Sequence, residues 1–334
     1  MTIESTAITG PHPAHGLLGR AARHLVHCPP SWDHYLLEAP SSGEERFLLT
    51  GDTPGAHPLF NDGPGHFHDP QLVTEAVREV GEFVGHQYFG VPSARPGLFY
   101  RVGLELTETA AWRRGSGPAR MTTELRAVPG HVVDGVPRDL DFRLEVSLDD
   151  TPCATGTASL VFVMPGVHRR QLAHSRWAVR AAPELADEPD GPVRPVAPGA
   201  VGRGAAANVV LGEPVGFAGG RLSLWLLAPS DNPALGGSTP DGHLSGTLLM
   251  EALRQAAVLT AGRTVGLVPE RTLPASCRVH FRGFAEADLP VRCTAEPGPL
   301  GRDGAGRPAV PVTLTLTQNR RTVVEARTTV VQDF

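Results

Sequence analysis

Two glutamate–arginine pairs carry the residue types and the spacing that acid–base chemistry needs. Glu75 and Arg78 stand in the phrase EAVR, and Glu251 and Arg254 stand in EALR; 251 − 75 and 254 − 78 are both 176. Two residues three apart on a helix lie on one face, so each arginine can pair with its glutamate. A carboxylate on a buried helix is costly unless it is paired, and near a substrate it can accept a proton. A single pair would be explained by a structural salt bridge, but its repetition favours a functional role.

The segments just before the two pairs add further candidates. His68 stands in HFHDP and His243 in DGHLSG, and each histidine could act as an acid or a base near neutral pH. A surface-loop or capping role explains each histidine equally well. Asp69 suits the N-cap of the first helix, and Gly246 is a small residue at the start of the second. Exposed N–H groups at such helix starts can hold a thioester oxygen as negative charge develops on it.

Apolar periodicity predicts two long helices, over residues 70–88 and 246–261. The second helix is apolar on most of its circumference, which indicates burial nearly all round. Its polar exceptions include Gln255, which falls on one narrow stripe with Glu251 and Arg254. The second helix therefore carries a charged stripe in an otherwise apolar setting.

Short apolar segments broken by Pro, Ser and Gly surround each helix and are typical of strands. In the second half these segments include ANVVLGE (207–213) and GRLSLWLLA (220–228). Each module is thus predicted as strands, one long helix, and then an antiparallel meander, which is the hot-dog arrangement. Two such modules predict an α+β double hot-dog fold, with two long central helices each wrapped by an antiparallel sheet and related by pseudo-two-fold symmetry.

Changes in composition predict the domain boundaries. We expect a disordered N-terminal lead over 1–20, a first hot-dog domain over 21–165, a linker over 166–200 and a second hot-dog domain over 201–334. The linker is predicted because the sequence changes there from basic (GVHRRQLAHSRWAVR) to acidic (PELADEP) and then to proline-rich. Its basic part could dock an acidic acyl carrier protein, although a solvated face is the simpler explanation.

Bulk composition excludes several classes of function. The 334 residues are 41% apolar and 19% charged, which is typical of a globular protein with two domains. A net charge of −5 argues against a general nucleic-acid binder. No apolar run is long enough to span a bilayer, and the N-terminus lacks the pattern of a signal peptide. We therefore expect a cytoplasmic protein that binds neither nucleic acid nor membrane.

Neither a metal nor a cofactor is expected from the sequence. The chain contains no lysine, which excludes a Schiff base and a P-loop lysine, so a phosphate would be held by arginine or by backbone N–H groups. The four cysteines are scattered and form no C-x-x-C motif, and HFHD is an incomplete set of metal ligands. VGRGAAANVV follows no strand of a βαβ unit, and the chain has no G-x-S-x-G motif.

At these residues the sequence resembles the A-factor synthase family, which makes γ-butyrolactone signalling precursors in actinomycetes. The resemblance rests on VH…YLLEA and HPLFND…HDPQLVTEAVREVG…HQYFGVP in the first half, and on VGR…NVVL and NPAL…GHLSGTLLMEALRQAA in the second. It implies a double hot-dog fold and a reaction that joins a β-ketoacyl group on acyl carrier protein to the hydroxyl of dihydroxyacetone phosphate. The helix glutamates and arginines of the family map onto Glu75, Arg78, Glu251 and Arg254. The loop LGGSTPDGHLSG departs from the fuller pattern of the family, which leaves the identity of the acceptor open.

The leading hypothesis is an acyltransferase of secondary metabolism that gives a γ-butyrolactone or butenolide precursor. A helix glutamate would be the general base, helix N-terminal amides would hold the oxyanion, and Arg254 or Arg78 would orient the glutamate or bind the acceptor phosphate. Two alternatives stay open. One is a hot-dog dehydratase that acts on a carrier-bound hydroxyacyl chain, and the other is a non-catalytic protein that binds an acyl ligand.

In hot-dog dimers the helix carboxylate of one module commonly faces the helix-start loop of the other. We therefore expect two composite sites in this chain. Glu251 should lie near the loop that holds His68 and Asp69, and Glu75 should lie near His243.

Overall fold

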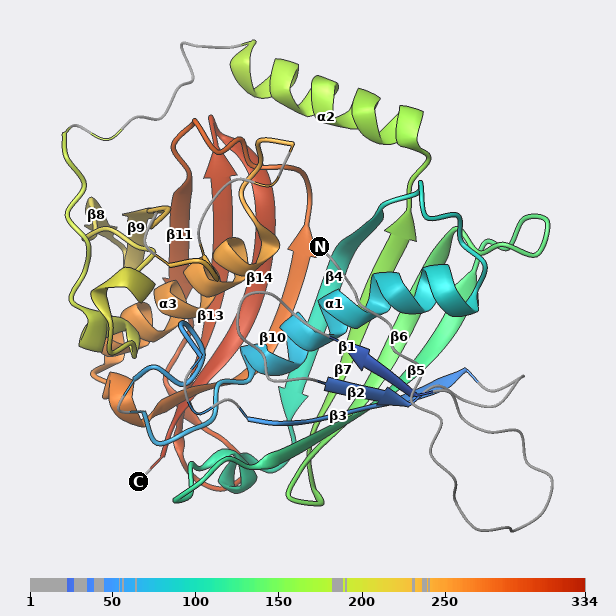
Figure 1. The fold of residues 1–334 in the computed structure, drawn as a ribbon. Coiled ribbons are helices and arrows are strands. Elements are labelled where there is room, and N and C mark those ends of the chain that lie inside the picture. Colours follow the sequence, from blue (N-terminus) through green and yellow to red (C-terminus); the bar gives the residue numbers. More distant parts are fainter. Residues whose placement is uncertain are drawn as a thin grey trace.

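The computed structural model describes residues 23–26, 35–38, 45–53, 55, 57–63, 65–181, 189, 191–229, 232–235, 239 and 241–333 (Figure 1). The segment 1–20, predicted as a disordered lead, lies outside the described residues. The helices are α1 (Gln71–Tyr88), α2 (Pro165–Arg180) and α3 (Gly246–Val265). The strands are β1 (Arg23–Val26), β2 (Tyr35–Glu38), β3 (Arg46–Asp52), β4 (Gly97–Leu106), β5 (Arg120–Gly130), β6 (Asp139–Leu148), β7 (Thr151–Phe162), β8 (Gly216–Ala218), β9 (Arg221–Trp225), β10 (Thr272–Phe281), β11 (Arg292–Pro297), β12 (Gly301–Arg302), β13 (Pro308–Gln318) and β14 (Arg321–Gln332).

The described strands form one 14-stranded sheet in which every pairing is antiparallel. Its order is β1-β2-β3-β5-β6-β7-β4-β10-β14-β13-β11-β9-β8, and β12 pairs with β13. Outward from the β4–β10 pairing, the order β4-β7-β6-β5-β3-β2 on one side corresponds to β10-β14-β13-β11-β9-β8 on the other. The pseudo-two-fold axis therefore passes between β4 and β10, which we call the seam, and the predicted double hot-dog fold is confirmed.

The two long helices lie on the same side of the sheet, each over its own half (Figure 1). Helix α3 is buried nearly all round, as its apolar circumference predicted, and even Glu251 and Gln255 are buried. It begins at Ser245, whose Oγ accepts a hydrogen bond from the Leu248 N–H at 3.2 Å. Helix α1 begins after Pro70, and there Oδ1 of Asp69 accepts from the Gln71 N–H at 3.1 Å.

Helix α1 packs very close to the sheet because two of its residues have no side chain. A Cβ at Gly85 would lie 2.0 Å from Cζ of Phe162, and one at Gly81 would lie 2.7 Å from Cζ of Phe99. Both rings come from strands of the first half. The glycines, which weaken a helix by propensity, therefore allow the close approach that buries the apolar face of α1.

The region predicted as a linker contains helix α2, which runs along one edge of the molecule outside the sheet (Figure 1). Its Arg176 donates from Nε to Glu286 at 2.8 Å, and its Arg180 pairs with Asp288 at 2.8 Å. Both acidic partners belong to the second half, so α2 is fastened to the half that follows it. No helix in the described part of the chain is both long and apolar enough to cross a membrane.

The segment ANVVLGE was predicted as a strand, but none of its residues belongs to a strand of the sheet. Ala206–Asn208 is a 3-10 turn, and further along Leu211 and Gly212 form isolated bridges, with Leu226 and Pro195. The physical reason is a side chain on α3. Gln255 donates from Nε2 to the Asn208 carbonyl at 2.6 Å, and its Oε1 accepts from the Val210 N–H at 3.0 Å. A side-chain amide thus satisfies backbone groups that would otherwise pair in a ladder.

Candidate active site

Glu251 is completely buried on α3, and several donors converge on its carboxylate. Arg203 donates from Nε at 2.8 Å and from Nη2 at 2.5 Å. Arg254 donates from Nε at 3.0 Å and from Nη2 at 2.8 Å, and Gln255 donates from Nε2 at 2.6 Å. Burial alone would raise the pKa of Glu251, but the charges of Arg203 and Arg254 outweigh it and lower this pKa to about 2. Glu251 is therefore ionised and hydrogen-bonded at any ordinary pH.

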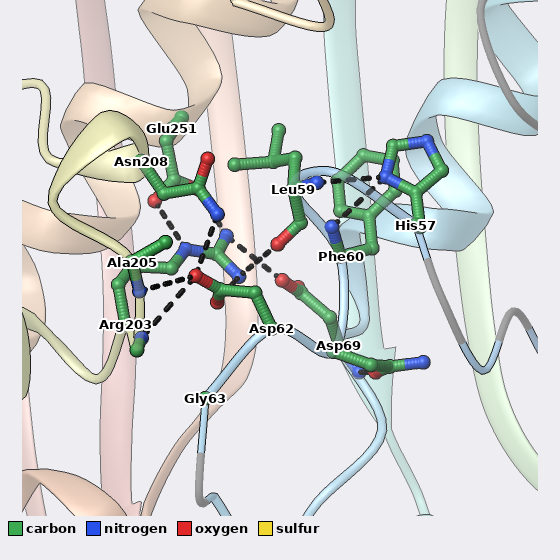
Figure 2. A network of polar contacts seen from close by, with 12 residues as sticks. His57, Leu59, Phe60, Asp62, Gly63, Asp69, Arg203, Ala205, Asn208 and Glu251 are labelled. Atoms are coloured by element: carbon green, nitrogen blue, oxygen red, sulfur yellow. Dashed lines mark hydrogen bonds and ion pairs between the residues drawn. The ribbon is translucent and has the colours of Figure 1, made fainter. Parts of the chain in front are cut away.

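Arg203 joins the Glu251 carboxylate to the first half of the chain (Figure 2). It follows a turn that ends at Gly202, whose φ of 66° is left-handed and suits glycine. The guanidinium is 3% exposed; it lies 2.9 Å from Oδ2 of Asp69 and donates to the Leu59 carbonyl at 2.9 Å. One buried arginine of the second half thus pairs with carboxylates from both halves, and its Nη2 contacts both Glu251 and Asp69.

Asp62 fastens the same loop of the first half to the turn around Arg203 (Figure 2). Its Oδ2 accepts from the backbone N–H groups of Gly204 at 3.2 Å and Ala205 at 3.1 Å, and from Nδ2 of Asn208 at 2.5 Å. Its Oδ1 lies 3.4 Å from Nη1 of Arg203. These contacts hold the two halves in one relative position at the site.

His57 lies in the same loop and is held as a neutral imidazole. Its Nδ1 accepts from the N–H groups of Leu59 and Phe60, both at 3.0 Å, so the nitrogen that carries the proton in the neutral ring is Nε2. Burial lowers the pKa of His57 to about 4, against the opposing charges of Asp69 and Glu75. His57 is therefore electrically neutral at pH 7, although the charges of Asp69 and Glu75 act to raise its pKa.

An apolar pocket opens beside this network, between the start of α1, the middle of α3 and strands β4, β10, β13 and β14. It encloses about 520 Å³ when its open mouth is included. Its lining residues are Asp69, Pro70, Gln71, Thr74, Leu104, Met250, Leu253, Arg254, Pro274, Cys277, Val279, Leu314, Ala326 and Thr328. Most of these side chains are apolar, so the pocket suits a hydrocarbon chain.

A second pocket, which we call the arginine pocket, adjoins the apolar one. Its lining residues are Asn61, Gly63, Gly65, Phe67, His68, Asp69, Pro70, Arg114, Gly202, Arg203, Arg254, Pro269, Thr272, Leu273 and Pro274. Asp69, Pro70, Arg254 and Pro274 line both pockets, and we call these four residues the junction. At the junction, the arginine pocket thus meets the pocket lined mostly by apolar side chains.

Arg254 presents one free nitrogen at the junction. Its Nε and Nη2 hold Glu251, and Nη2 also donates to the Val201 carbonyl at 3.0 Å. Within the part of the chain that the structure describes, its Nη1 makes no hydrogen bond. Glu251 therefore fixes the guanidinium in place while leaving one pair of N–H donors for a ligand.

His68 lines the arginine pocket and is 4% exposed. Its Nδ1 is buried and has no hydrogen-bond partner among the described residues. Burial lowers the pKa of His68, and the charge of Arg114 lowers it further. The ring is therefore neutral at pH 7, and its unpaired nitrogen is a candidate contact for a ligand.

The start of α1 leaves no amide for an oxyanion. Pro70 has no N–H, and the N–H groups of Gln71, Leu72 and Val73 donate to Oδ1 of Asp69, the Asp69 carbonyl and the Pro70 carbonyl. The backbone amides of this turn are therefore not available to stabilise an oxyanion. Arg254 offers the free donor instead.

The second glutamate–arginine pair lies where α1 meets the start of α3. Glu75 accepts from Arg78 at 2.5 Å and from Oγ1 of Thr247 at 2.9 Å, and Arg78 also contacts Glu79. A Cβ on Gly246 would lie 3.9 Å from Cδ of Arg78. Arg78 lowers the pKa of Glu75 against the effect of burial, whereas burial raises the pKa of Glu79. Glu75 thus meets the helix start of the other half.

His243, predicted to lie near Glu75, makes its side-chain hydrogen bond with another carboxylate. Its Nε2 lies 3.0 Å from Oε1 of Glu286, and its ring is 3% exposed. Glu286 in turn pairs with Arg176 of α2 at 2.8 Å. The structure therefore brings His243 together with the contacts of α2, and Thr247 is the residue that reaches Glu75.

Several residues of the site were not predicted from the sequence, although most of them lie in the phrases that carried the family resemblance. His57 and Asp62 belong to HPLFND, and Arg203 and Asn208 belong to VGR…NVVL, phrases that carried the resemblance. Those phrases mark residues without assigning contacts to them. Arg114 stood in no such phrase. Among the described residues, no group of three or more His, Cys, Asp or Glu side chains is arranged to hold a metal.

Comparison with known proteins places this geometry in a family. The chain is 30% identical over 287 residues to a Streptomyces virginiae protein named 2-oxo-3-(phosphooxy)propyl 3-oxoalkanoate synthase, which covers 84% of this chain and 89% of that protein. A Streptomyces coelicolor protein of the same name is 29% identical over 279 residues, 82% of each chain.

Solved structures show the same fold at much lower identity. A candidate thioesterase from Novosphingobium aromaticivorans has a TM-score of 0.51 at 14% identity and covers 88% of this chain and 97% of its own. A candidate oleoyl thioesterase from Lactobacillus plantarum has a TM-score of 0.51 at 9% identity, with coverages of 87% and 98%. The family model for the A-factor biosynthesis hotdog domain matches residues 11–164 and 185–332, nearly the whole chain. The motifs, the fold and these matches agree, and the chain belongs to the A-factor biosynthesis hotdog family.

Proposed function

We propose that this protein is an acyltransferase that moves a β-ketoacyl group from acyl carrier protein to the hydroxyl of dihydroxyacetone phosphate. The product would be a γ-butyrolactone or butenolide precursor. The name of its relatives describes such an ester, a 3-oxoalkanoate carrying a 2-oxo-3-(phosphooxy)propyl group. The observation that carries the proposal is the junction, where a hydrocarbon-lined pocket meets one lined by three arginines.

The two pockets suit the two substrates. The acyl chain fills the apolar pocket, which places the thioester carbonyl at the junction. There the free Nη1 of Arg254 donates to the carbonyl oxygen as negative charge develops on it, in place of a backbone oxyanion hole. The acceptor lies in the arginine pocket with its hydroxyl toward the same carbonyl carbon.

We assign Glu251 a positioning role rather than that of the base. Its carboxylate is hydrogen-bonded to three side chains, and a pKa of about 2 makes it a poor proton acceptor at neutral pH. Its negative charge instead holds Arg203 and Arg254 in place. Glu75 and Arg78 remain candidates for a second site, and Glu75→Gln assayed beside Glu251→Gln with one acyl donor tests that possibility.

His68 is the base that the geometry supports. The acceptor hydroxyl oxygen attacks the thioester carbonyl carbon, and its proton passes to the neutral imidazole. The tetrahedral intermediate then breaks its C–S bond, and the leaving thiolate of the carrier takes that proton. The proton of the acceptor hydroxyl therefore leaves on the carrier thiol, and His68 is neutral again.

The test uses acyl carrier protein loaded with a 3-oxoacyl chain and follows it by intact-protein mass spectrometry, with and without dihydroxyacetone phosphate. We expect deacylation of the carrier and a phosphorylated ester only when the acceptor is present. Equal deacylation without the acceptor would indicate a thioesterase. Loss of water from a loaded hydroxyacyl chain would indicate a dehydratase, and stable binding without turnover would indicate a ligand-binding protein.

The base is tested with His68→Gln, which keeps a polar side chain but cannot accept the proton. Turnover should fall by roughly 10²–10⁴-fold. His131→Gln, at a histidine whose side chain is 84% exposed, is the matched control and should keep wild-type turnover. A folded His68→Gln variant with full activity would rule out His68 as the base.

A further inference from the structure

We propose that Arg114 forms a phosphate-binding subsite at the outer side of the arginine pocket, where it holds the phosphate monoester of the acceptor. The identity of that acceptor rests on the proposed function above, whereas the subsite itself rests on the hydrogen bonds of Arg114 and on its place beside His68 in the pocket. Nothing in the sequence motifs pointed to Arg114.

The side chain of Arg114 is held at one edge and free at the other. Its Nη1 donates to the carbonyls of Asn61 at 3.2 Å and Gly63 at 3.1 Å, and its backbone N–H donates to the His66 carbonyl at 2.7 Å. Among residues that the structure describes, its Nε and Nη2 make no hydrogen bond. This free edge presents two parallel N–H donors, the geometry that binds two phosphate oxygens at once.

The other arginines of the pocket are already neutralised. Arg203 pairs with Glu251, Asp69 and Asp62, and Arg254 pairs with Glu251. Arg114 forms no ion pair with a described residue, so its charge is the one available to an anion. Because the chain has no lysine, an arginine must supply any side-chain cation for a phosphate.

A second observation at the same place points to a ligand. His68 lines the pocket beside Arg114, and its buried Nδ1 lacks a partner among the described residues. An adjoining hollow is lined by Thr53, Gly55, Asn61, His68, Arg114, Gly115, Ser116, Gly117 and Pro118. A Cβ at Gly115 or Gly117 would meet nothing within 4 Å, so this loop leaves room for an anion next to its backbone.

The placement also sets a direction for a short acceptor. Arg114 and Arg254 line the same pocket, and Arg254 belongs to the junction whereas Arg114 does not. A phosphate on Arg114 therefore directs the opposite end of a short acceptor toward His68 and the junction. The phosphate would act as a handle that positions the hydroxyl.

The first experiment measures binding of glycerol 3-phosphate by isothermal titration calorimetry, with no acyl donor present. Arg114→Ala should weaken binding by about 10- to 100-fold, the effect of losing charge-assisted hydrogen bonds. Arg114→Lys should weaken it less, because the charge remains but the paired donors are lost. Arg221→Ala is the matched control, since it removes one arginine from an exposed pair with Glu296 and should leave affinity unchanged.

The second experiment compares dihydroxyacetone phosphate with dihydroxyacetone as acceptors. Arg114→Ala should raise KM for the phosphorylated acceptor about 10- to 100-fold and leave kinetics with dihydroxyacetone unchanged. Wild-type binding that Arg114→Ala abolishes, with no ester formed by any variant, would uphold the subsite and refute the proposed function. Ester formation with unchanged KM and Kd in Arg114→Ala, or no binding of glycerol 3-phosphate to the wild type, would overturn the subsite.

Discussion

Two buried charges at the site, Glu251 and Arg203, depend on each other. Removing either ion from water costs several kcal/mol, and their attraction offsets this cost only because the hydrogen bonds are complete. Glu251 is fully buried and Arg203 nearly so, and donors or acceptors from both halves surround them. The cluster thus specifies one arrangement of the loops that line the junction.

Replacing Glu251 by Gln is therefore expected to destabilise the protein. The change leaves Arg203 buried with weaker compensation, and breaking such a pair costs about 3–5 kcal/mol. Thermal unfolding measures it: the melting temperature should fall clearly. Glu124→Gln, at an exposed pair with Arg46, is the control and should change stability by less than about 1 kcal/mol.

The pH dependence of this effect has a definite sign. The pKa of Glu251 is lower in the folded protein, about 2, than its usual 4.5. Its ionic stabilisation is therefore complete above pH 4.5 and is lost as the pH falls toward 2. The difference in unfolding free energy between wild type and Glu251→Gln should narrow over that range. A difference that stays constant down to pH 2 would contradict the assignment.

Part of this cluster could be predicted from sequence. The pairing of Glu251 with Arg254 follows from a spacing of three residues on one helix, and the nearness of Asp69 follows from the two-module symmetry. Arg203 could not be predicted, because it lies 48 residues before Glu251 and reaches it from an irregular turn. Local spacing carries no information about such a contact.

At the scale of the elements, helix α1 is defined by close packing as much as by periodicity. Its apolar residues face strands β4 and β7, and Gly81 and Gly85 bring the helix axis close to the rings of that sheet. A glycine inside a helix is normally unfavourable, so its presence twice on one face indicates contact with another element.

Gly85→Ala tests this packing. Alanine improves helix propensity by about 1 kcal/mol, but its Cβ would overlap the Phe162 ring, and overpacking costs about 1–3 kcal/mol. We expect a net loss of stability in chemical denaturation. Gly166→Ala on α2, where a Cβ meets nothing within 4 Å, should be neutral or slightly stabilising. Equal effects of the two changes would show that Phe162 moves aside without cost.

The elements predicted well are those whose pattern is local. Both long helices and most strands were predicted because apolar spacing and turn residues mark them within a short window. Helix α2 was hidden in a region of changing charge, since its mostly polar sequence has few apolar residues to mark a face. The turn at Ala206–Asn208 was missed because the side chain of Gln255, 47 residues from Asn208, takes the place of a strand partner.

At the scale of the whole molecule, the seam makes the two halves one structural unit. Strands β4 and β10 pair from Ser276 with Glu105 to His280 with Arg101, and Arg203 crosses between halves at the site. A half on its own would expose the edge of β4 or β10, and exposed edges pair with other chains. Neither half contains a complete junction.

Splitting the chain between Ala181 and Pro189 tests this dependence. The two polypeptides, expressed together, should copurify as a one-to-one complex when only one carries an affinity tag. Expressed separately, each should aggregate or self-associate, which size-exclusion chromatography would show. Two monomeric, soluble halves that do not associate would contradict the proposed interdependence.

Joining the halves in one polypeptide has a further consequence for the paired helices. In a dimer of identical chains, every substitution appears in both copies and alters both sites together. Here Gln255 contacts the backbone of Asn208 and Val210, whereas the residue 176 positions earlier is Glu79, which contacts Arg78. In the fused chain, a mutation in one module therefore leaves the corresponding residue of the other module unchanged. One module can then specialise its site while the other keeps a structural role.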